Sequence, residues 1–414
     1  MTAHKLHSSE PIRCRNAPAP TATFNPYHLM KLICYVVLLA SIMVSLAPAQ
    51  SVSVLGLTKT RHHDQTAAGT TAFYEYSLRG FVEGQSLSAS FPSPSNRFTR
   101  SGGGPYVLGY VNGRWDYEEF FSSKALLDAA FPNTSYDFLV GASPAVSLTF
   151  ASDGYPTQPV ITVSAGTWHQ GRLLISPAQA ASGFTLTSNP SNGNGFLTLQ
   201  VFSSATDIVD EVVTLNPGLD ATISGTVPPG SLEIQQFYDV HAEFDHVTSS
   251  ASLTGQTWAA PNSFGYALFS SNTWFEIEVL NELTAWRLQY LGTIENTGTA
   301  ADDADADGDG IVNAMEFATG QHPATRGVLN TSVTRTGGNV EFVYPRNVAA
   351  FAAGTEYFVE WSDSLPGTSW STVGVVEEVQ SDNGTLQQIK ATLPAGTGNK
   401  RFVRLRITLP APIE

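Results

Sequence analysis

Hydrophobic and polar side chains alternate along the chain between about residues 159 and 280. The alternation is clearest in three runs: Leu197, Leu199 and Val201; Tyr238, Val240, Ala242 and Phe244; and Phe275, Ile277 and Val279. Successive side chains of a β-strand point to opposite faces of a sheet, so this period predicts strands with one buried face. Proline and glycine turns separate the runs, and their spacing favours a β-sandwich of the immunoglobulin or fibronectin type III kind.

The flanking segments are also predicted to be β-rich. Asn112 and Gly113 form a hairpin signal, and residues 122–130 read as one short helix with a serine N-cap. Strand patterns return after residue 328 and include a second Asn-Gly turn at Asn383 and Gly384. These patterns predict β domains on both sides of the central one.

The first 49 residues are expected to be absent from the mature protein. Lys31, an apolar run over 32–46 and the small-x-small pattern at 47–49 have the three-part design of a secretory signal peptide. The alternative is a single membrane-spanning anchor. We interpret residues 30–49 as the signal peptide and residues 1–29 as a mis-assigned or unstructured extension. The protein is therefore expected to be secreted, extracellular or on the cell surface, with a periplasmic location as the alternative, and without a membrane anchor after cleavage.

The mature chain is strongly acidic and lacks cysteine. The segment 1–49 contains four of the 21 Lys and Arg residues, one of the 36 Asp and Glu residues, and both cysteines, Cys14 and Cys34. Its removal leaves 17 basic and 35 acidic residues, a net charge of −18. Such a charge disfavours nucleic acid as a partner, because phosphate backbones are repelled. No disulfide, cysteine nucleophile or cysteine-based zinc site is expected in the mature chain.

An acidic loop at residues 305–316 matches the template of a calcium site. Its candidate ligands are the carboxylates at positions one, three, five and twelve, the carbonyl at seven and the side chain at nine: Asp305, Asp307, Asp309, Glu316, Ile311 and Asn313. Gly310 stands at position six, where the chain must turn sharply around the ion. Calcium prefers oxygen ligands, and four acids within twelve residues repel one another without a cation. Ca²⁺ is therefore the predicted cofactor; the alternative is an acidic, solvated turn.

The flanks of this loop differ from those of an EF-hand sensor. A helical pattern over 282–291 stops at Gly292, so no helix runs directly into the loop, and a second short helix over 315–319 ends at Gly320. Asn296, Asp302 and Asp303 precede the loop and are candidates for a second ion. A lone loop lacks the paired partner that sensors use, so a structural role for the ion is expected.

Other polar clusters are weaker candidates for chemistry. Asp239, His241, Glu243 and Asp245 share one face of a predicted strand and could bind zinc, but the favoured interpretation is the polar outer face of a sandwich. The segment 61–64 is expected to be a solvated loop. Glu118 and Glu119 are adjacent, so on a strand they point to opposite faces and cannot flank one glycosidic bond unaided.

No nucleophile elbow, phosphate loop or zinc helix is present in the sequence. The protein is therefore expected not to be an enzyme; the alternative is a glycoside-acting hydrolase. Six aromatic residues form a possible sugar-stacking platform: Tyr106, Tyr110, Trp115, Tyr117, Trp258 and Trp274.

Two stretches resemble pieces of large exported proteins of verrucomicrobial-type bacteria. One begins at Thr284, contains the acidic loop and ends at Pro323, and it is similar to their helix–calcium-loop–helix module. The other covers residues 113–132. The loop itself resembles those of dockerin and thrombospondin type 3 repeats. This family is largely uncharacterised, so the resemblance implies secretion, calcium and modular architecture but no catalytic residue.

Together these patterns predict a mainly β chain of tandem β-sandwich domains with a short helix–calcium-loop–helix insert. The expected segments are an N-terminal β-rich domain at 50–155, an immunoglobulin- or fibronectin III-like sandwich at 156–280, the calcium module at 281–323 and a small β domain at 324–414. We expect a secreted, calcium-binding adhesion, binding or structural protein, with an extracellular glycan or surface protein as a possible partner. The alternative is a carbohydrate-binding or polysaccharide-acting protein.

Overall fold

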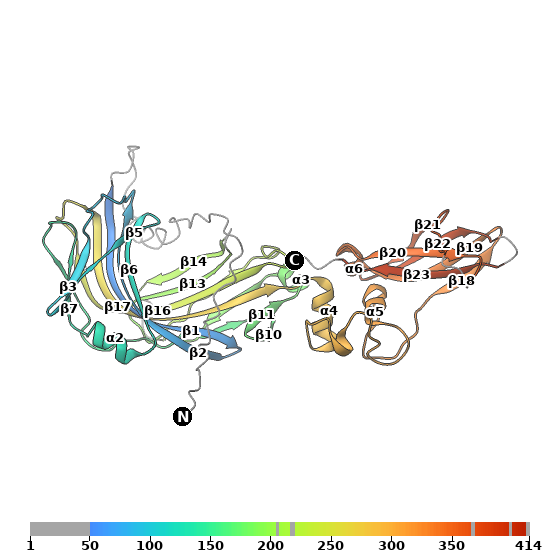
Figure 1. The fold of residues 1–414 in the computed structure, drawn as a ribbon, viewed down its shortest axis with the longest axis horizontal. Coiled ribbons are helices and arrows are strands. Elements are labelled where there is room, and N and C mark those ends of the chain that lie inside the picture. Colours follow the sequence, from blue (N-terminus) through green and yellow to red (C-terminus); the bar gives the residue numbers. More distant parts are fainter. Residues whose placement is uncertain (1–49, 204–206, 216–219, 366–368, 397–399, 411–414) are drawn as a thin grey trace, which may run out of the picture.

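The computed structural model describes residues 50–203, 207–215, 220–365, 369–396 and 400–410. The predicted signal peptide and the extension before it lie outside the described residues. A large β body and a smaller β domain lie at opposite ends of the long axis of the molecule, with two short helices between them (Figure 1). The chain is mainly β, with several separate sheets and few helices, as predicted.

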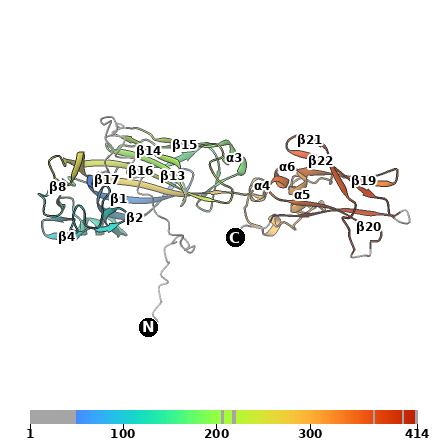
Figure 2. The ribbon, with the colours of Figure 1, turned by 90° about the horizontal axis from the view of Figure 1, so that it is seen from above.

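A ten-stranded sheet forms the frame of the large body. Eight of its strands follow one another in the order β14 (Asp207–Leu215), β13 (Phe196–Phe202), β16 (Phe237–Ser252), β17 (Ala259–Val279), β1 (Ser51–Ala67), β2 (Thr70–Gln85), β6 (Arg114–Phe121) and β5 (Gly109–Val111). The two others are β11 (Arg172–Ile175), which pairs with the far end of β17, and β10 (Thr167–His169), which pairs with β11. The long strands run through the whole body in both views (Figures 1 and 2).

Strand β1 lies at the centre of this sheet, and this corrects the prediction of a solvated loop at 61–64. His62 and His63 are only 9% and 6% exposed. β1 pairs with β2 on one side and runs parallel to β17 on the other, with Leu57 opposite Ala267. The turn-like composition misled because β1 is paired with another strand along each of its two edges, inside the sheet, where polar and apolar residues are buried alike.

Two smaller sheets cover one face of the long sheet. The first has the order β4 (Gly103–Val107), β3 (Arg97–Arg100), β7 (Ser135–Leu139) and β8 (Val146–Thr149). The second has the order β15 (Ser224–Val227), β12 (Phe184–Ser188) and β9 (Ile161–Val163). Each encloses a hydrophobic core, one including Leu57 and Phe138, the other Leu199 and Leu186. Burial of these apolar side chains is the main favourable contribution to folding of the body.

The predicted border between residues 155 and 156 falls between the two cores, but the long sheet crosses it. Ala267 and Phe269 of β17 belong to the first core, whereas Phe275 and Ile277 of the same strand belong to the second. All four have odd numbers and therefore lie on one face of the strand. The two sandwiches are thus placed side by side on one shared sheet.

Local signals in the large body agree with the structure. Asn112 and Gly113 have positive φ and join β5 to β6 in a two-residue hairpin. Helix α2 (Lys124–Ala130) begins after Ser123, whose hydroxyl accepts a hydrogen bond from the N–H of Leu126. A second helix, α3 (Pro177–Ser182), follows β11. Short-range turn and cap chemistry was sufficient to predict the hairpin and α2.

The C-terminal domain packs two sheets around a third core. One has the order β18 (Ser332–Thr336), β19 (Asn339–Asn347), β22 (Leu386–Pro394) and β21 (Val376–Asp382), and the other pairs β20 (Glu356–Ser362) with β23 (Phe402–Thr408). Alternate side chains such as Tyr344, Val359 and Ile389 fill the space between them. A short helix, α6 (Val348–Ala352), follows β19.

Helices α4 (Glu282–Leu291) and α5 (Asn313–Thr319), with the short 3-10 turn η1 (Gly298–Ala300), connect the two β regions. α4 ends at Gly292 and α5 at Gly320, both in the left-handed conformation, as the sequence predicted. Trp286, Phe317 and Ala350 form a small core that joins α4, α5 and α6. In the described part of the chain, no helix is long and apolar enough to cross a membrane.

Candidate functional site

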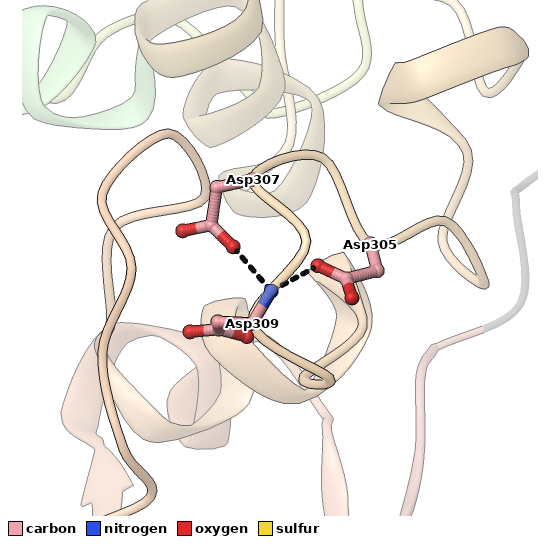
Figure 3. Close-up of side chains that lie close together, drawn as sticks. All are labelled: Asp305, Asp307 and Asp309. Carbon is pink, nitrogen blue, oxygen red and sulfur yellow. Dashed lines mark hydrogen bonds between the residues drawn. The ribbon is translucent and has the colours of Figure 1, made fainter.

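The predicted calcium loop brings three aspartates together. One carboxylate oxygen each from Asp305, Asp307 and Asp309 lies within 4.8 Å of the others. The N–H of Asp309 donates 3.1 Å hydrogen bonds to Oδ1 of both Asp305 and Asp307, which holds the three side chains around one turn of backbone (Figure 3). Carboxylates at this spacing can provide the oxygen ligands that Ca²⁺ requires.

The backbone of the loop is shaped for close approach to these carboxylates. Gly308 and Gly310 have φ of 75° and 95°, a region that residues with a Cβ rarely adopt. In this conformation the N–H groups of Gly310 and Gly308 donate 2.8 Å hydrogen bonds to Asp305. The hydrogen bond from Gly310 is the largest cause that lowers the pKa of Asp305, and that from Gly308 lowers it further. Asp305 therefore remains charged.

The two later candidate ligands lie at the start of α5. Asn313 and Glu316 are each 1% exposed, and the Asn313 Oδ1 and Glu316 Oε2 atoms have no hydrogen-bond partner. Asp307 Oδ2 is also buried without a partner. Oxygens left in this state cost free energy unless a donor or a cation meets them. The donor set thus fits a hard cation.

Glu316 is electrostatically the most strained of these acids. Its burial, together with the charges of Asp307, Asp309 and Asp305, raises its pKa to about 7. Glu316 is not one of the three residues whose oxygens lie within 4.8 Å of one another. The negative charges of all three aspartates nevertheless act on its carboxyl group. A divalent cation among the four carboxylates would remove this repulsion.

Asn313 has a second role that the sequence did not reveal. Its Nδ2 donates to the carbonyl oxygens of Thr299 and Ala301, at 2.8 and 2.7 Å. Its N–H donates to the carbonyl of Ala304. The side chain therefore fastens the start of α5 to the turn before the loop. The predicted carbonyl contact of Ile311 stays a prediction; its N–H donates to Asp309 Oδ1 at 2.8 Å.

Asp302, a candidate for a second ion, accepts hydrogen bonds from two side chains of the protein. Its Oδ1 accepts a 2.6 Å hydrogen bond from Arg287 Nη2, and its Oδ2 accepts one of 2.8 Å from Asn296. Arg287 is buried in α4, so this ion pair attaches the segment before the loop to that helix. Asp303 is exposed. A second ion at this point stays a prediction.

The other candidate clusters fall on the long sheet. Asp239, His241, Glu243 and Asp245 occupy one face of β16, opposite the second core, as expected. His241, Glu243 and Asp245 also line a groove, which the sequence did not predict. Glu118 lines the same groove, and adjacent Glu119 does not. Within the described residues, the grouping of three close metal-binding side chains is confined to the aspartates of the loop.

The proposed aromatic platform is not assembled. Trp115 and Trp258 are 4% and 6% exposed and belong to the first core, and three more of its members pack against that core: Tyr106, Tyr110 and Tyr117. Trp274 is the exception, because it lines the groove on the opposite face of the sheet. Large aromatic side chains contribute much apolar area, which is why most of them are drawn into the core.

Comparison with known proteins adds little to this description. No family model and no curated protein matches the chain. Two solved structures of the yeast delta-COP-I mu-homology domain, one complexed with a Dsl1 WxWxV peptide, each align with 57% of this chain and with 99% and 100% of their own. Identity is 9% and 7%, respectively, and the TM-score is 0.18 in both cases, too low to support an inference.

Proposed function

We propose that this chain is a secreted, non-enzymatic binding protein in which a Ca²⁺ ion held by residues 305–316 orders the connection between its β regions. Secretion follows from the predicted signal peptide at 30–49. The dockerin- or thrombospondin type 3-like character of the loop belongs to the same proposal, as does the immunoglobulin or fibronectin III type of the sandwich at 156–280.

The observation that carries the proposal is the buried, unpartnered Oε2 of Glu316. This residue is 1% exposed, and its burial, followed by the charges of the three aspartates, raises its pKa. A protein that only needed a turn here would gain stability from an apolar or amide side chain at this position. The arrangement becomes more favourable once a divalent cation offsets part of the negative charge of the four carboxylates.

The loop contacts both of its flanks, which supports a bracing role. Arg326, in the segment that leads to β18, donates through Nε to the carbonyl of Asp307 at 2.9 Å. The N–H of Gly327 donates to Asp309 Oδ2 at 2.8 Å. On the other side, Asp302 is paired with Arg287 of α4. An ion that orders the loop therefore also orders the chain entering and leaving it.

Helix α5 transmits this order to the C-terminal domain. Tyr357 of β20 donates through its hydroxyl to the carbonyl of Ala318 at 2.6 Å, and Asn347 donates through Nδ2 to the carbonyl of Phe317 at 3.0 Å. Preceding α4, Asn281 caps that helix and follows β17 of the long sheet after a single residue. The calcium module is thus part of a continuous connection between the two β regions.

The expected energetic effect is modest. Extracellular modules bind calcium with dissociation constants of roughly 10⁻⁴ to 10⁻³ M. Millimolar calcium then adds on the order of 0.5–1.5 kcal/mol to the free energy of unfolding. This is small for a whole domain but sufficient to order a connecting segment.

The test is thermal melting of the full chain in millimolar calcium and in chelator. We expect calcium to raise the melting temperature by about 2–4 °C. Asp305→Ala should abolish this shift, because it removes a ligand at position one. Glu316→Gln should abolish it too, and in chelator it should stabilise the chain by on the order of 1 kcal/mol after solvent screening, because one of four repelling charges is gone.

Glu295→Ala is the matched control, since Glu295 is an exposed acid in the segment between α4 and the loop. It should leave the calcium shift unchanged. A shift that persists in both Asp305→Ala and Glu316→Gln would overturn the assignment of the ion to this loop.

A further inference from the structure

A groove of about 510 Å³ lies on the face of the long sheet opposite the two cores. Its walls come from six adjacent strands, β13, β16, β17, β1, β2 and β6. Strand pairing brings one polar row together across five of these strands, from β13 to β2: Thr198, Glu243, Asn272, His62 and Glu75. The volume is in the range of small-ligand sites.

The floor of the groove contains buried acceptors without partners. Asp245 and Asn272 are 7% and 5% exposed, and the Oδ1 atom of each has no hydrogen-bond partner. Both side chains line the groove. Buried oxygens of this kind cost free energy unless a donor reaches them, so the floor is arranged to accept hydrogen bonds from a ligand.

Aromatic rings lie at the walls of the groove. Tyr74 and Phe120 are 43% and 52% exposed, which leaves much of each ring open to solvent. His241 stacks on Trp274 with ring centroids 4.2 Å apart and holds the indole in place. Rings that are open and positioned in this way offer apolar faces to a flat, partly apolar ligand.

Two of the acids that line the groove, Glu83 and Glu243, have partners within the protein. Arg79 pairs with Asp116 and Glu83, at 3.0 and 3.4 Å. Glu243 accepts a 2.7 Å hydrogen bond from Ser270 and lies 3.3 Å from His241 Nε2. These acids therefore do not need a cationic ligand, and they repel anionic ones.

Burial opposes the charged form of three further acids. Burial is the largest cause that raises the pKa of Asp245, Glu75 and Glu118, and the charge of Glu243 raises that of Asp245 further. Carboxyl oxygens accept hydrogen bonds from hydroxyl groups. The groove thus suits a ligand that is uncharged, carries several hydroxyl groups and has an apolar face.

We propose that this groove binds a neutral oligosaccharide, with its sugar rings against Tyr74, Phe120 and Trp274 and its hydroxyl groups on Asp245 and Asn272. The proposal names the ligand class of the binding role proposed above and rests on that role, but its residues are separate from those of the calcium loop.

The test uses the full chain in constant millimolar calcium, so that it is independent of the calcium assignment. The protein is titrated by calorimetry with neutral hexasaccharides of glucose, mannose and xylose, and with an acidic uronic-acid hexasaccharide and a lysine-rich peptide for comparison. We expect at least one neutral hexasaccharide to bind and the acidic one not to bind.

Tyr74→Ala and Phe73→Ala form a matched pair for this test. The two residues are neighbours on β2 with the same 43% exposure, but Phe73 does not line the groove and instead contacts His63 and Tyr76. Tyr74→Ala should weaken sugar binding about tenfold or more, while Phe73→Ala should leave it within about twofold. Melting temperatures of both variants check that the fold is retained.

Several outcomes would overturn the proposal. They are the absence of binding to every neutral hexasaccharide at millimolar concentration, equal weakening by both substitutions, and binding of the lysine-rich peptide alone. Cleavage of the hexasaccharide during the titration would also overturn it, because the groove would then be a hydrolytic site and not a binding site. A lost calcium shift with intact sugar binding would count against the calcium proposal only.

Discussion

Two acid-rich regions of this molecule are built in opposite ways. The predicted calcium loop takes Asp305, Asp307, Asp309 and Glu316 from twelve consecutive residues, and oxygens of the three aspartates lie within 4.8 Å of one another. The groove collects its acids from several strands of the long sheet, and one of them, Glu83, is paired with Arg79. We therefore expect the loop to require a cation and the groove to bind without one. Under the two proposals, a similar content of carboxylates serves different ligands because the side chains around the carboxylates differ.

The two regions also differ in what supports them. The loop is attached to a small core, in which Trp286 and Phe317 are the large members. The groove lies on a sheet whose other face carries two extensive cores. Burial of apolar area is what resists deformation of either site, so the loop is expected to be the more easily disturbed of the two.

The largest effect is expected from Phe317→Ala. Phe317 is 2% exposed in α5 and stacks edge-on against Trp286, with ring centroids 5.7 Å apart. Its truncation should cost about 3–4 kcal/mol, because it leaves a cavity in a small core. Urea denaturation of the full chain measures this cost, and sugar binding in the groove should be unaffected. Val328→Ala, at a position that is 83% exposed, is the control. Equal stability of the two variants would contradict the assigned role of this core.

A smaller loss of stability is expected when the pH is lowered, and it should arise in the large body. Burial is the main cause that lowers the pKa of both His62 and His63 to about 4, so the folded sheet favours neutral imidazoles. The stability gained in this way is complete above pH 6.5 and is lost as the pH falls from 6.5 through 4. Between pH 7 and pH 4.5 the body should lose on the order of 2 kcal/mol.

Urea denaturation at the two pH values measures this loss, and a variant with His62→Gln and His63→Gln should show less of it. Exposed His322, which packs against Tyr290 beside the loop, provides the control substitution His322→Gln. If the double variant and the wild type lose the same stability between pH 7 and pH 4.5, the buried histidines are not the cause.

The smallest expected effect is that of a change in one region on ligand binding by the other. Because the groove and the loop share no residues, chelation of calcium should change the affinity for a neutral hexasaccharide by less than about twofold. Conversely, Tyr74→Ala should leave the calcium-dependent melting shift unchanged. Calorimetric titration in chelator and melting of the variant measure the two directions. A reciprocal change in both would show that the regions are coupled through the connecting module.

Local patterns predicted the elements that depend on neighbours in the sequence. The serine cap of α2, the Asn112-Gly113 hairpin and the ends of α4 and α5 at Gly292 and Gly320 were all found as expected. Each depends on hydrogen bonds or backbone angles within a few residues, so composition and spacing contain the necessary information. Alternation also predicted the buried and polar faces of β13, β16 and β17.

Long-range pairing was beyond such patterns. β1 was not recognised because its burial depends on β17, about 200 residues later in the chain, which lies parallel to it. The aromatic platform failed for a related reason. Composition identified Trp115 and Trp258 as large rings, but only packing decided that both are in the first core. A period of two indicates that one face is buried without indicating what covers it.

The sequence by itself therefore determined the acidic loop, since the candidate ligands follow one another at fixed spacing and the glycine at position six permits the turn between them. It also determined that the chain is mainly β. Only the tertiary structure decided that Asn272 of β17, Glu243 of β16 and His62 of β1 lie in one row. The register of hydrogen bonds between distant strands sets that row, and a one-residue shift would turn each side chain to the other face.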